Sequence, residues 1–246
     1  NFAEIPLRTN RIDSIDFKSI ILPTNLVSPR QMNFAFVQLC AQANAVAGGD
    51  FDKLFVPCRC VASDIYNREP VVLRNGVLGD AIRASMTFPF MYKPIVVDGR
   101  LLFDGGIFNN FPVDVMRSDF KPDVMIGSVV ATNPKKPEQG DIIMQVQNMI
   151  MTKTDYSIPP KEGLLFSFNS STYKMFDFDK VDELVQMGYD SIMKRMDEIK
   201  ARIPRRVTPE ETAAKRQEFK NRYPEFKFQR VAVEGVDSLQ KKYVEQ

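Results

Sequence analysis

The stretch of this sequence that says most about its fold is Leu101-Leu102-Phe103-Asp104-Gly105-Gly106-Ile107-Phe108-Asn109-Asn110-Phe111-Pro112. Its apolar opening predicts a strand, its glycines a tight turn, and Pro112 a helix start, because proline suits the first helical position. The carboxylate of Asp104 is therefore expected at the carboxyl end of a strand. Open α/β sheets bind ligands at that edge, so Asp104 is the first candidate functional residue.

The absence of histidine from all 246 residues limits the chemistry open to this chain. A general base here must be something other than imidazole. A carboxylate gains basicity when it is buried, and it can then deprotonate a serine within hydrogen-bond reach. The plain alternative for Asp104 is a turn aspartate that accepts hydrogen bonds from its own backbone.

The segments on either side of this stretch predict alternating helices and strands. Ser28 and Pro29 suit the N-cap and first position of a helix, and Gly48-Gly49 suits its C-terminal cap. Asp98-Gly99 is typical of a two-residue hairpin turn. Further helices are expected at 80–86, after Pro112 and at 141–154, and strands at 58–66, 70–74, 95–97, 100–103, 123–132 and 164–168. This order predicts an α/β fold with a mainly parallel sheet flanked by helices on both faces.

The C-terminal third predicts a change of organisation. Apolar periodicity from Asp179 predicts a long helix that ends before Pro204, and Thr208-Pro209-Glu210-Glu211 is a capping-box start for a largely polar helix. We expect a domain at 1–203, a linker with a bridging helix at 204–226, and the stub of another domain at 227–246. Because the chain opens on Asn1 and closes within a charged stretch, we expect a piece of a longer polypeptide.

Composition excludes several classes of function. With 33 Lys and Arg against 31 Asp and Glu, the net charge of +2 offers no field for nucleic acid. The longest uncharged apolar run, Val124–Ala131, is far shorter than the ~20 residues of a membrane-spanning helix. Cys40, Cys58 and Cys60 fit buried thiols better than a redox or metal site, since CxxC spacing is absent. No metal or cofactor is expected.

Residues Gly79–Pro112 resemble the patatin-like phospholipases. The resemblance rests on Ala81-Ile82-Arg83-Ala84-Ser85-Met86-Thr87-Phe88-Pro89 and on Asp98-Gly99-Arg100 followed by Leu101–Pro112. Its specific part covers Leu54 to about Pro134, with looser support on either side. It implies a three-layer α/β fold, incomplete at its N-terminal side. It also implies lipid acyl-ester hydrolysis, in which a serine on a G-x-S-x-G turn attacks the ester and the aspartate of a D-G-[GA] motif assists without histidine.

The same resemblance implies roles for five residues. Asp104 is the proton acceptor, Gly105 and Gly106 form the tight turn beside it, and Asn110 and Pro112 are framework that starts the next helix. Arg83 and Ser85 receive no catalytic role, because helix packing and turn hydrogen bonds explain them equally well.

The serine half of such a site is missing from the sequence. No Gly-x-Ser-x-Gly and no Gly-rich oxyanion loop occurs, and Ser63, Ser85, Ser128 and Ser167 lie on predicted strands or helices. We therefore expect the chain alone to be inactive and its parent to be a phospholipase A-type Ser–Asp hydrolase of membrane phospholipid or another lipid ester. The alternative is a catalytically silent patatin-like scaffold for binding or assembly.

Two further segments bear on partners. Phe228–Gly235 with Tyr243-Val244 resembles the opening of a polypeptide-transport-associated (POTRA) module, which implies the bacterial outer membrane or cell surface; an unspecific terminal arm is the alternative. Phe88, Phe90, Met91 and Tyr92 are candidates for an apolar lip for acyl chains, although core packing is the commoner use of such residues. A homo-oligomer is compatible with the sequence.

Overall fold

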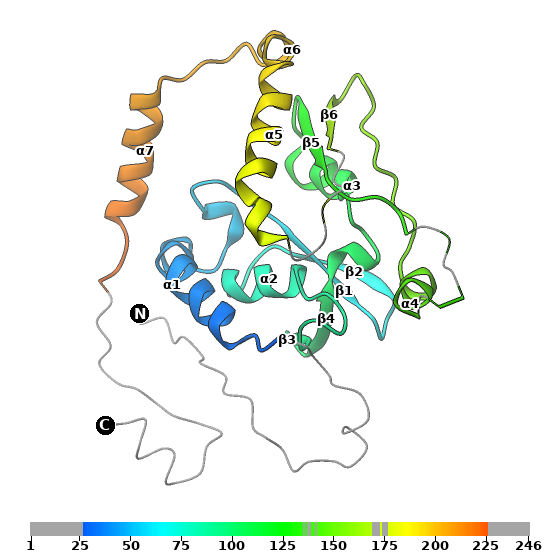
Figure 1. Cartoon of the computed structure of the whole chain (residues 1–246). Coiled ribbons are helices and arrows are strands. Elements are labelled where there is room, and N and C mark those ends of the chain that lie inside the picture. The colour runs from blue at the N-terminus through cyan, green and yellow to red at the C-terminus, as the bar shows by residue number, and fades with distance from the viewer. Residues whose placement is uncertain are drawn as a thin grey trace.

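The computed structural model describes residues 27–134, 136, 139–140, 142–168, 173 and 177–225 (Figure 1). The strands are β1 Cys60–Asp64, β2 Glu69–Leu73, β3 Ile95–Val97, β4 Arg100–Asp104, β5 Met125–Val129 and β6 Gly163–Ser167. The helices are α1 Arg30–Ala47, α2 Leu78–Ser85, α3 Val113–Val115, α4 Ile142–Ile150, α5 Val181–Met193, α6 Met196–Arg202 and α7 Pro209–Asn221. Short 3-10 helices lie at η2 Phe51–Lys53, η3 Gly105–Ile107 and η5 Phe178–Lys180, and a π-helical turn, η4, at Met116–Phe120.

The larger sheet has four strands in the order β2-β1-β4-β3, and all of its neighbours are antiparallel. The link from β1 to β2 is short, and the one from β3 to β4 is shorter still. Parallel neighbours need a crossover of a dozen or more residues, so these links impose hairpins. The expected mainly parallel sheet is therefore wrong for the described strands, since three of their four pairings are antiparallel.

The second sheet is the parallel pair β5–β6, which starts with Met125 opposite Gly163 and ends with Val129 opposite Ser167. Its connection carries α4 and is long enough for a crossover. The outer carbonyls of β6 are satisfied by arginines: Arg195 Nη1 donates to Leu165 O at 2.8 Å, and Arg202 Nη1 to Gly163 O at 3.0 Å. The expected α/β fold class is thus confirmed, with its parallel element in this pair.

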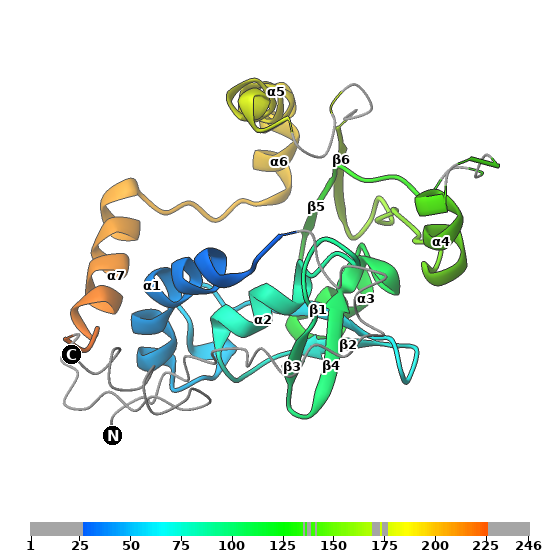
Figure 2. The same ribbon diagram turned by 60° about the horizontal axis from the view of Figure 1, so that its bottom comes forward.

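The main core lies between the four-stranded sheet and the elements α2 and η2, and α1 packs against α2 and η2 (Figure 2). Its buried members are apolar: Phe51, Ala62, Leu73, Ala81, Ala84 and Leu102. Phe51 and Leu102 have no exposed surface, and burial of each such side chain stabilises the fold by about 1.5–3 kcal/mol. This core fixes β4, and with it the position of Asp104.

The helices end close to where the sequence predicts, but one predicted helix is interrupted. Gly48 caps α1 with φ 62°, but the helix begins at Arg30, one residue later than expected, and Pro29 rather than Ser28 is the N-cap. The capping box of Thr208 and Glu211 is present at the start of α7. The single helix expected from Asp179 is divided into α5 and α6 by a turn at Lys194 and Arg195.

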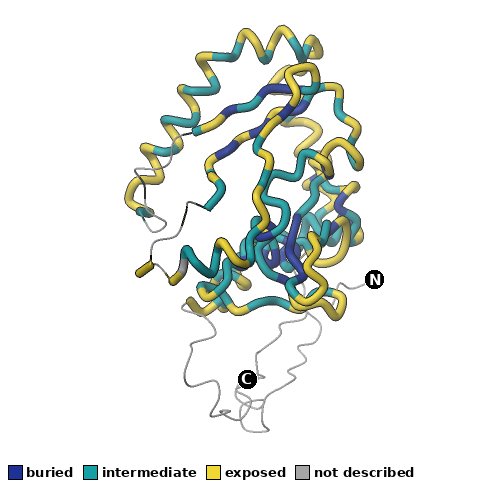
Figure 3. Tube along the Cα trace, turned by 90° about the vertical axis from the view of Figure 1, so that its right-hand side faces the viewer, coloured by how far each residue is buried: buried dark blue, intermediate teal, exposed yellow. Residues whose placement is uncertain are grey.

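Burial is concentrated in the strands, in α2 and in the turns next to them, whereas α5 and α6 have no buried residue (Figure 3). Among the described helices, none is long and apolar enough to span a membrane. The stub expected at 227–246 lies outside the described residues, so the proposed domain boundaries stay predictions.

Candidate active site

Asp104 is the last residue of β4 and the N-cap of η3. Its Oδ1 accepts a hydrogen bond from the Gly106 N–H at 2.7 Å, and its own N–H donates to Thr87 O at 2.9 Å. Across the sheet it is the partner of Ala62 in β1. The carboxylate is therefore held by the turn, and the backbone of Asp104 is held by Thr87, two residues beyond α2, and by the neighbouring strand.

Both glycines are required by close approach rather than by an unusual φ. A Cβ on Gly105 would lie 2.2 Å from Val61 O, and a Cβ on Gly106 would lie 2.7 Å from Asn110 Oδ1 and 3.0 Å from Asp104 Oδ1. Gly105 and Gly106 begin η3 directly after Asp104, and their part in an active site stays a prediction. The absent side chain of Gly105 lets the turn lie against β1, and that of Gly106 leaves room for the side chains of Asn110 and Asp104.

The electrostatics of Asp104 suit a base stronger than an ordinary carboxylate. Its side chain is half-buried, and burial raises the pKa of the carboxyl, while the hydrogen bond from the Gly106 N–H offsets part of that rise. None of the ion pairs found among the described residues includes Asp104. The hydrogen bond from the Gly106 N–H is also the one expected of an ordinary turn aspartate. Asp104 can therefore stabilise the turn and act as a base.

Asn110 and Pro112, the two expected framework residues, lie between η3 and α3, and Pro112 precedes the helix instead of opening it. Asn110 Nδ2 donates to the Tyr156 hydroxyl at 2.6 Å, and Pro112 is the N-cap of the short helix α3. Tyr156 also packs its ring against Phe111, with the ring centroids 5.9 Å apart. The turn is thereby tied to the segment between α4 and β6, which gives Asn110 a structural role.

Arg83 serves packing, as the sequence indicated. It is 3% exposed, donates to the Thr87 hydroxyl and to Lys93 O, and places its guanidinium 5.3 Å from the ring centroid of Tyr92. Burial lowers its pKa from the usual value. The Thr87 carbonyl accepts the Asp104 N–H, so Arg83 supports the candidate base indirectly, through Thr87.

The four serines weighed as nucleophiles lie on regular elements, as predicted: Ser63 on β1, Ser85 at the end of α2, Ser128 on β5 and Ser167 on β6. Ser63 has no exposed surface, and its hydroxyl lacks a hydrogen-bond partner within the described structure. No hydrogen bond joins any of them to Asp104 in the residues that are described.

An ion cluster fixes the far end of the helix that follows the site. Asp119 in η4 accepts from Arg59 Nε at 2.6 Å and from Arg74 Nε at 2.7 Å. These arginines hold the pKa of the Asp119 carboxyl well below its usual range, with Arg74 the larger influence. The cluster connects η4 to the start of β1 and the end of β2.

Sequence reasoning overlooked two residues at this site, Thr87 and Tyr156. Thr87 is buried, and it lies within the stretch that resembles the patatin-like phospholipases, which was a usable signal. Tyr156 had no signal, because only the folded chain brings it to Asn110. The three cysteines are half-buried free thiols, and no group of three or more metal-ligating side chains forms within the described ranges.

Comparison with known proteins supports the resemblance over part of the chain. Residues 15–117 match the family model for patatin-like phospholipases. An uncharacterized NTE family protein of Mycobacterium tuberculosis is 27% identical over 142 residues, which cover 54% of this chain and 24% of that protein. A patatin-like phospholipase domain-containing protein of Caenorhabditis elegans is 32% identical over 115 residues, 45% of this chain and 8% of that protein.

A second uncharacterized NTE family protein of Mycobacterium tuberculosis is 42% identical over 62 residues, 25% of this chain and 17% of that protein. The matches thus span about a quarter or less of the length of these relatives. Residues 15–117 are therefore similar to the patatin-like phospholipases, and this stretch includes the D-G-G turn.

Proposed function

We propose that this chain supplies the acidic half of a lipid acyl hydrolase site, with Asp104 as the proton acceptor of a Ser–Asp dyad. The observation that carries the proposal is the Asp104 carboxylate itself. It is half-buried, fixed by the Gly106 N–H at 2.7 Å and raised in pKa by burial. The family resemblance supplies the reaction class.

In this reaction the serine hydroxyl attacks the ester carbonyl and transfers its proton to the Asp104 carboxylate. When the tetrahedral intermediate collapses, that proton passes to the departing alcohol, and an acyl-serine remains. Water then attacks the acyl-serine, again losing its proton to Asp104, which returns it to the serine oxygen. The nucleophile and the donors for the oxyanion must come from outside this sequence, which has no G-x-S-x-G turn.

The substrate class that fits is phospholipid or another lipid ester, with the acyl bond cleaved as in phospholipase A. Among the lip candidates, Phe90 is 54% exposed and lies at φ 67°, whereas Phe88, Met91 and Tyr92 are half-buried. Phe90 is thus the member of that group placed to meet an acyl chain. The outer-membrane location proposed from residues 227–246 would be tested by fractionating the cells that make the protein.

The test compares ester hydrolysis by Asp104→Asn and Asp98→Asn variants of the protein made from its complete reading frame. Asp98 is a matched control, because it is the aspartate of the other Asp-Gly pair and its side chain is exposed. Its φ of 50° is one that asparagine also adopts. Loss of a general base costs about 10²–10⁴-fold in rate. We expect that loss for Asp104→Asn and none for Asp98→Asn, with p-nitrophenyl butyrate and with phosphatidylcholine.

Two outcomes would change the proposal. Hydrolysis that survives Asp104→Asn undiminished removes Asp104 from the reaction. No hydrolysis by the unmodified protein, together with no labelling of a serine by a fluorophosphonate, favours the silent scaffold instead. The 246-residue chain alone is expected to be inactive in the same assays.

A further inference from the structure

The helix α4 carries an apolar stripe whose two end residues are exposed in the described structure and whose middle residue, Val146, is half-buried. Ile142, Val146 and Met149 recur at i, i+4 and i+7 and so share one side of the helix. Ile142 is 72% exposed and Met149 is 74% exposed. Apolar side chains that gather at such exposure mark an interaction surface.

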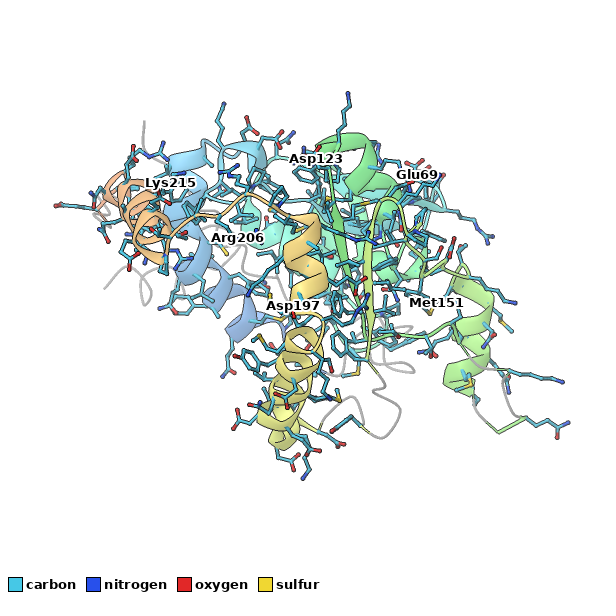
Figure 4. The ribbon with its side chains drawn as sticks, turned by 90° about the horizontal axis from the view of Figure 1, so that it is seen from above. Glu69, Asp123, Met151, Asp197, Arg206 and Lys215 are labelled. Atoms are coloured by element: carbon cyan, nitrogen blue, oxygen red, sulfur yellow. The ribbon has the colours of Figure 1, made fainter. Side chains whose placement is uncertain are left out.

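The position of α4 favours a partner outside the domain. The helix stands at the margin of the molecule in Figures 1 and 2, and Figure 4, in which Met151 is labelled just after its end, places it on the side away from α7. It lies in the connection between β5 and β6, and none of its residues belongs to the core cluster.

The chain that leaves α4 is fastened to the candidate active site. Thr152 N–H donates to Ile107 O, in the turn next to Asp104, at 2.7 Å. Four residues later, the Tyr156 hydroxyl accepts from Asn110 Nδ2 at 2.6 Å. Whatever surface α4 contacts is therefore held beside the D-G-G turn.

The polar groups of α4 are suited to an apolar environment. No charged residue occurs from Ile142 to Thr152. Two of its amide side chains donate to nearby carbonyls: Gln145 Nε2 to Gln139 O at 3.0 Å and Asn148 Nδ2 to Met144 O at 2.8 Å. An amide that keeps a hydrogen bond costs less to remove from water, so the helix can enter a lipid interface more readily than a charged helix.

We propose that α4 docks this protein on a phospholipid surface, with Ile142, Val146 and Met149 among the acyl chains and the D-G-G turn facing the same surface. This inference rests on the proposed function and specifies that the ester is taken from an interface. The described charges that flank α4, Lys136, Lys153 and Asp155, are exposed and of mixed sign. Apolar contact rather than attraction to anionic head groups therefore holds the helix, and zwitterionic lipid suffices.

The helix α5 provides a contrast on the same chain. Val185 and Tyr189 are 65% and 58% exposed, at i and i+4. However, α5 also carries Asp182, Glu183 and Asp190, which oppose insertion into lipid. Nothing in the described structure indicates what covers that stripe, and α5 serves as the control.

The experiment measures flotation of the 246-residue chain with phosphatidylcholine vesicles, without any turnover. Ile142→Glu/Met149→Glu should lower the bound fraction at least about tenfold, because two charges then meet the apolar layer. Val185→Glu/Tyr189→Glu, which adds the same charge at equally exposed positions, should bind as the unmodified chain does. Asp104→Asn should also bind normally, so failure of the catalytic proposal would leave this result intact.

Four results would overturn the inference. The first two are that the unmodified chain does not float, and that both double variants lose binding equally. Alternatively, binding requires phosphatidylserine and disappears at high salt, which would assign it to the lysines. Finally, sedimentation shows a dimer that only the α4 variant dissociates, which would make a second copy the occupant. Circular dichroism of each variant excludes unfolding as the cause of lost binding.

Discussion

Replacement of Gly105 by alanine should lower the free energy of unfolding more than an ordinary Gly→Ala change does. The new Cβ would lie 2.2 Å from Val61 O and 2.7 Å from Val61 C, both backbone atoms of β1. A close carbon–oxygen contact is about 3.3 Å, so β1 and the turn must separate by roughly 1 Å. A rotamer change cannot relieve this clash, because alanine has no side-chain rotamers.

The cost follows from that displacement. Overpacking of a tight site costs about 1–3 kcal/mol, and here it also strains the pairing of Ala62 with Asp104. We expect a loss near the upper end, about 3 kcal/mol, against a total stability of about 5–15 kcal/mol for a typical domain. Urea denaturation followed by circular dichroism would measure it as a lower midpoint.

Gly188 is the matched control for this measurement. It lies in the interior of α5 with nothing within 4 Å of a built Cβ, so alanine there should not lower stability and favours the helix by up to about 1 kcal/mol. If Gly105→Ala shifts the midpoint no more than Gly188→Ala does, the close approach of the turn to β1 is wrong.

Three other predictions concern single side chains. Asp104→Asn should stabilise the protein at neutral pH, because burial raises the pKa of the Asp104 carboxyl in the folded state and its ionisation is easier after unfolding. This gain in stability should vanish below about pH 4, where the carboxyl is protonated in both states. An equal gain at pH 3 and pH 7 would contradict the prediction. Asp119, whose pKa Arg74 and Arg59 lower, contributes stability that is present at neutral pH and lost as the pH falls below about 4. Asp119→Asn should therefore flatten the decline in urea midpoint toward pH 2, and a decline as steep as before would argue against the cluster. Phe90→Asp should reduce phosphatidylcholine hydrolysis by the complete protein while p-nitrophenyl butyrate hydrolysis persists; unchanged lipid hydrolysis would remove the lip.

Local signals in the sequence were sufficient for the features that depend on a few neighbouring residues. The hairpin turn is an example: Asp98 at φ 50° and Gly99 at φ 77° adopt the left-handed conformations that Asp-Gly predicts. The capping box of Thr208 and Glu211 and the position of Asp104 at a strand end are others. Each is set by backbone conformation within four residues.

Features that depend on distant residues could not be predicted in the same way. The pairing of β1 with β4 joins strands separated by α2, and nothing local in either strand specifies its neighbour. The hydrogen bond between Asn110 and Tyr156 likewise bridges 46 positions. The antiparallel direction of β1 and β2, by contrast, was available, because their short link excludes a parallel crossover.

The rate of fluorophosphonate labelling of the complete protein as a function of pH tests the role of Asp104 most directly. Labelling of the serine should rise through one ionisation whose pKa lies above that of an ordinary aspartate, as burial of this carboxyl requires. Asp104→Asn should abolish this dependence and slow labelling by at least about a hundredfold. A variant that labels at the original rate, with the same pH profile, would show that another group takes the proton.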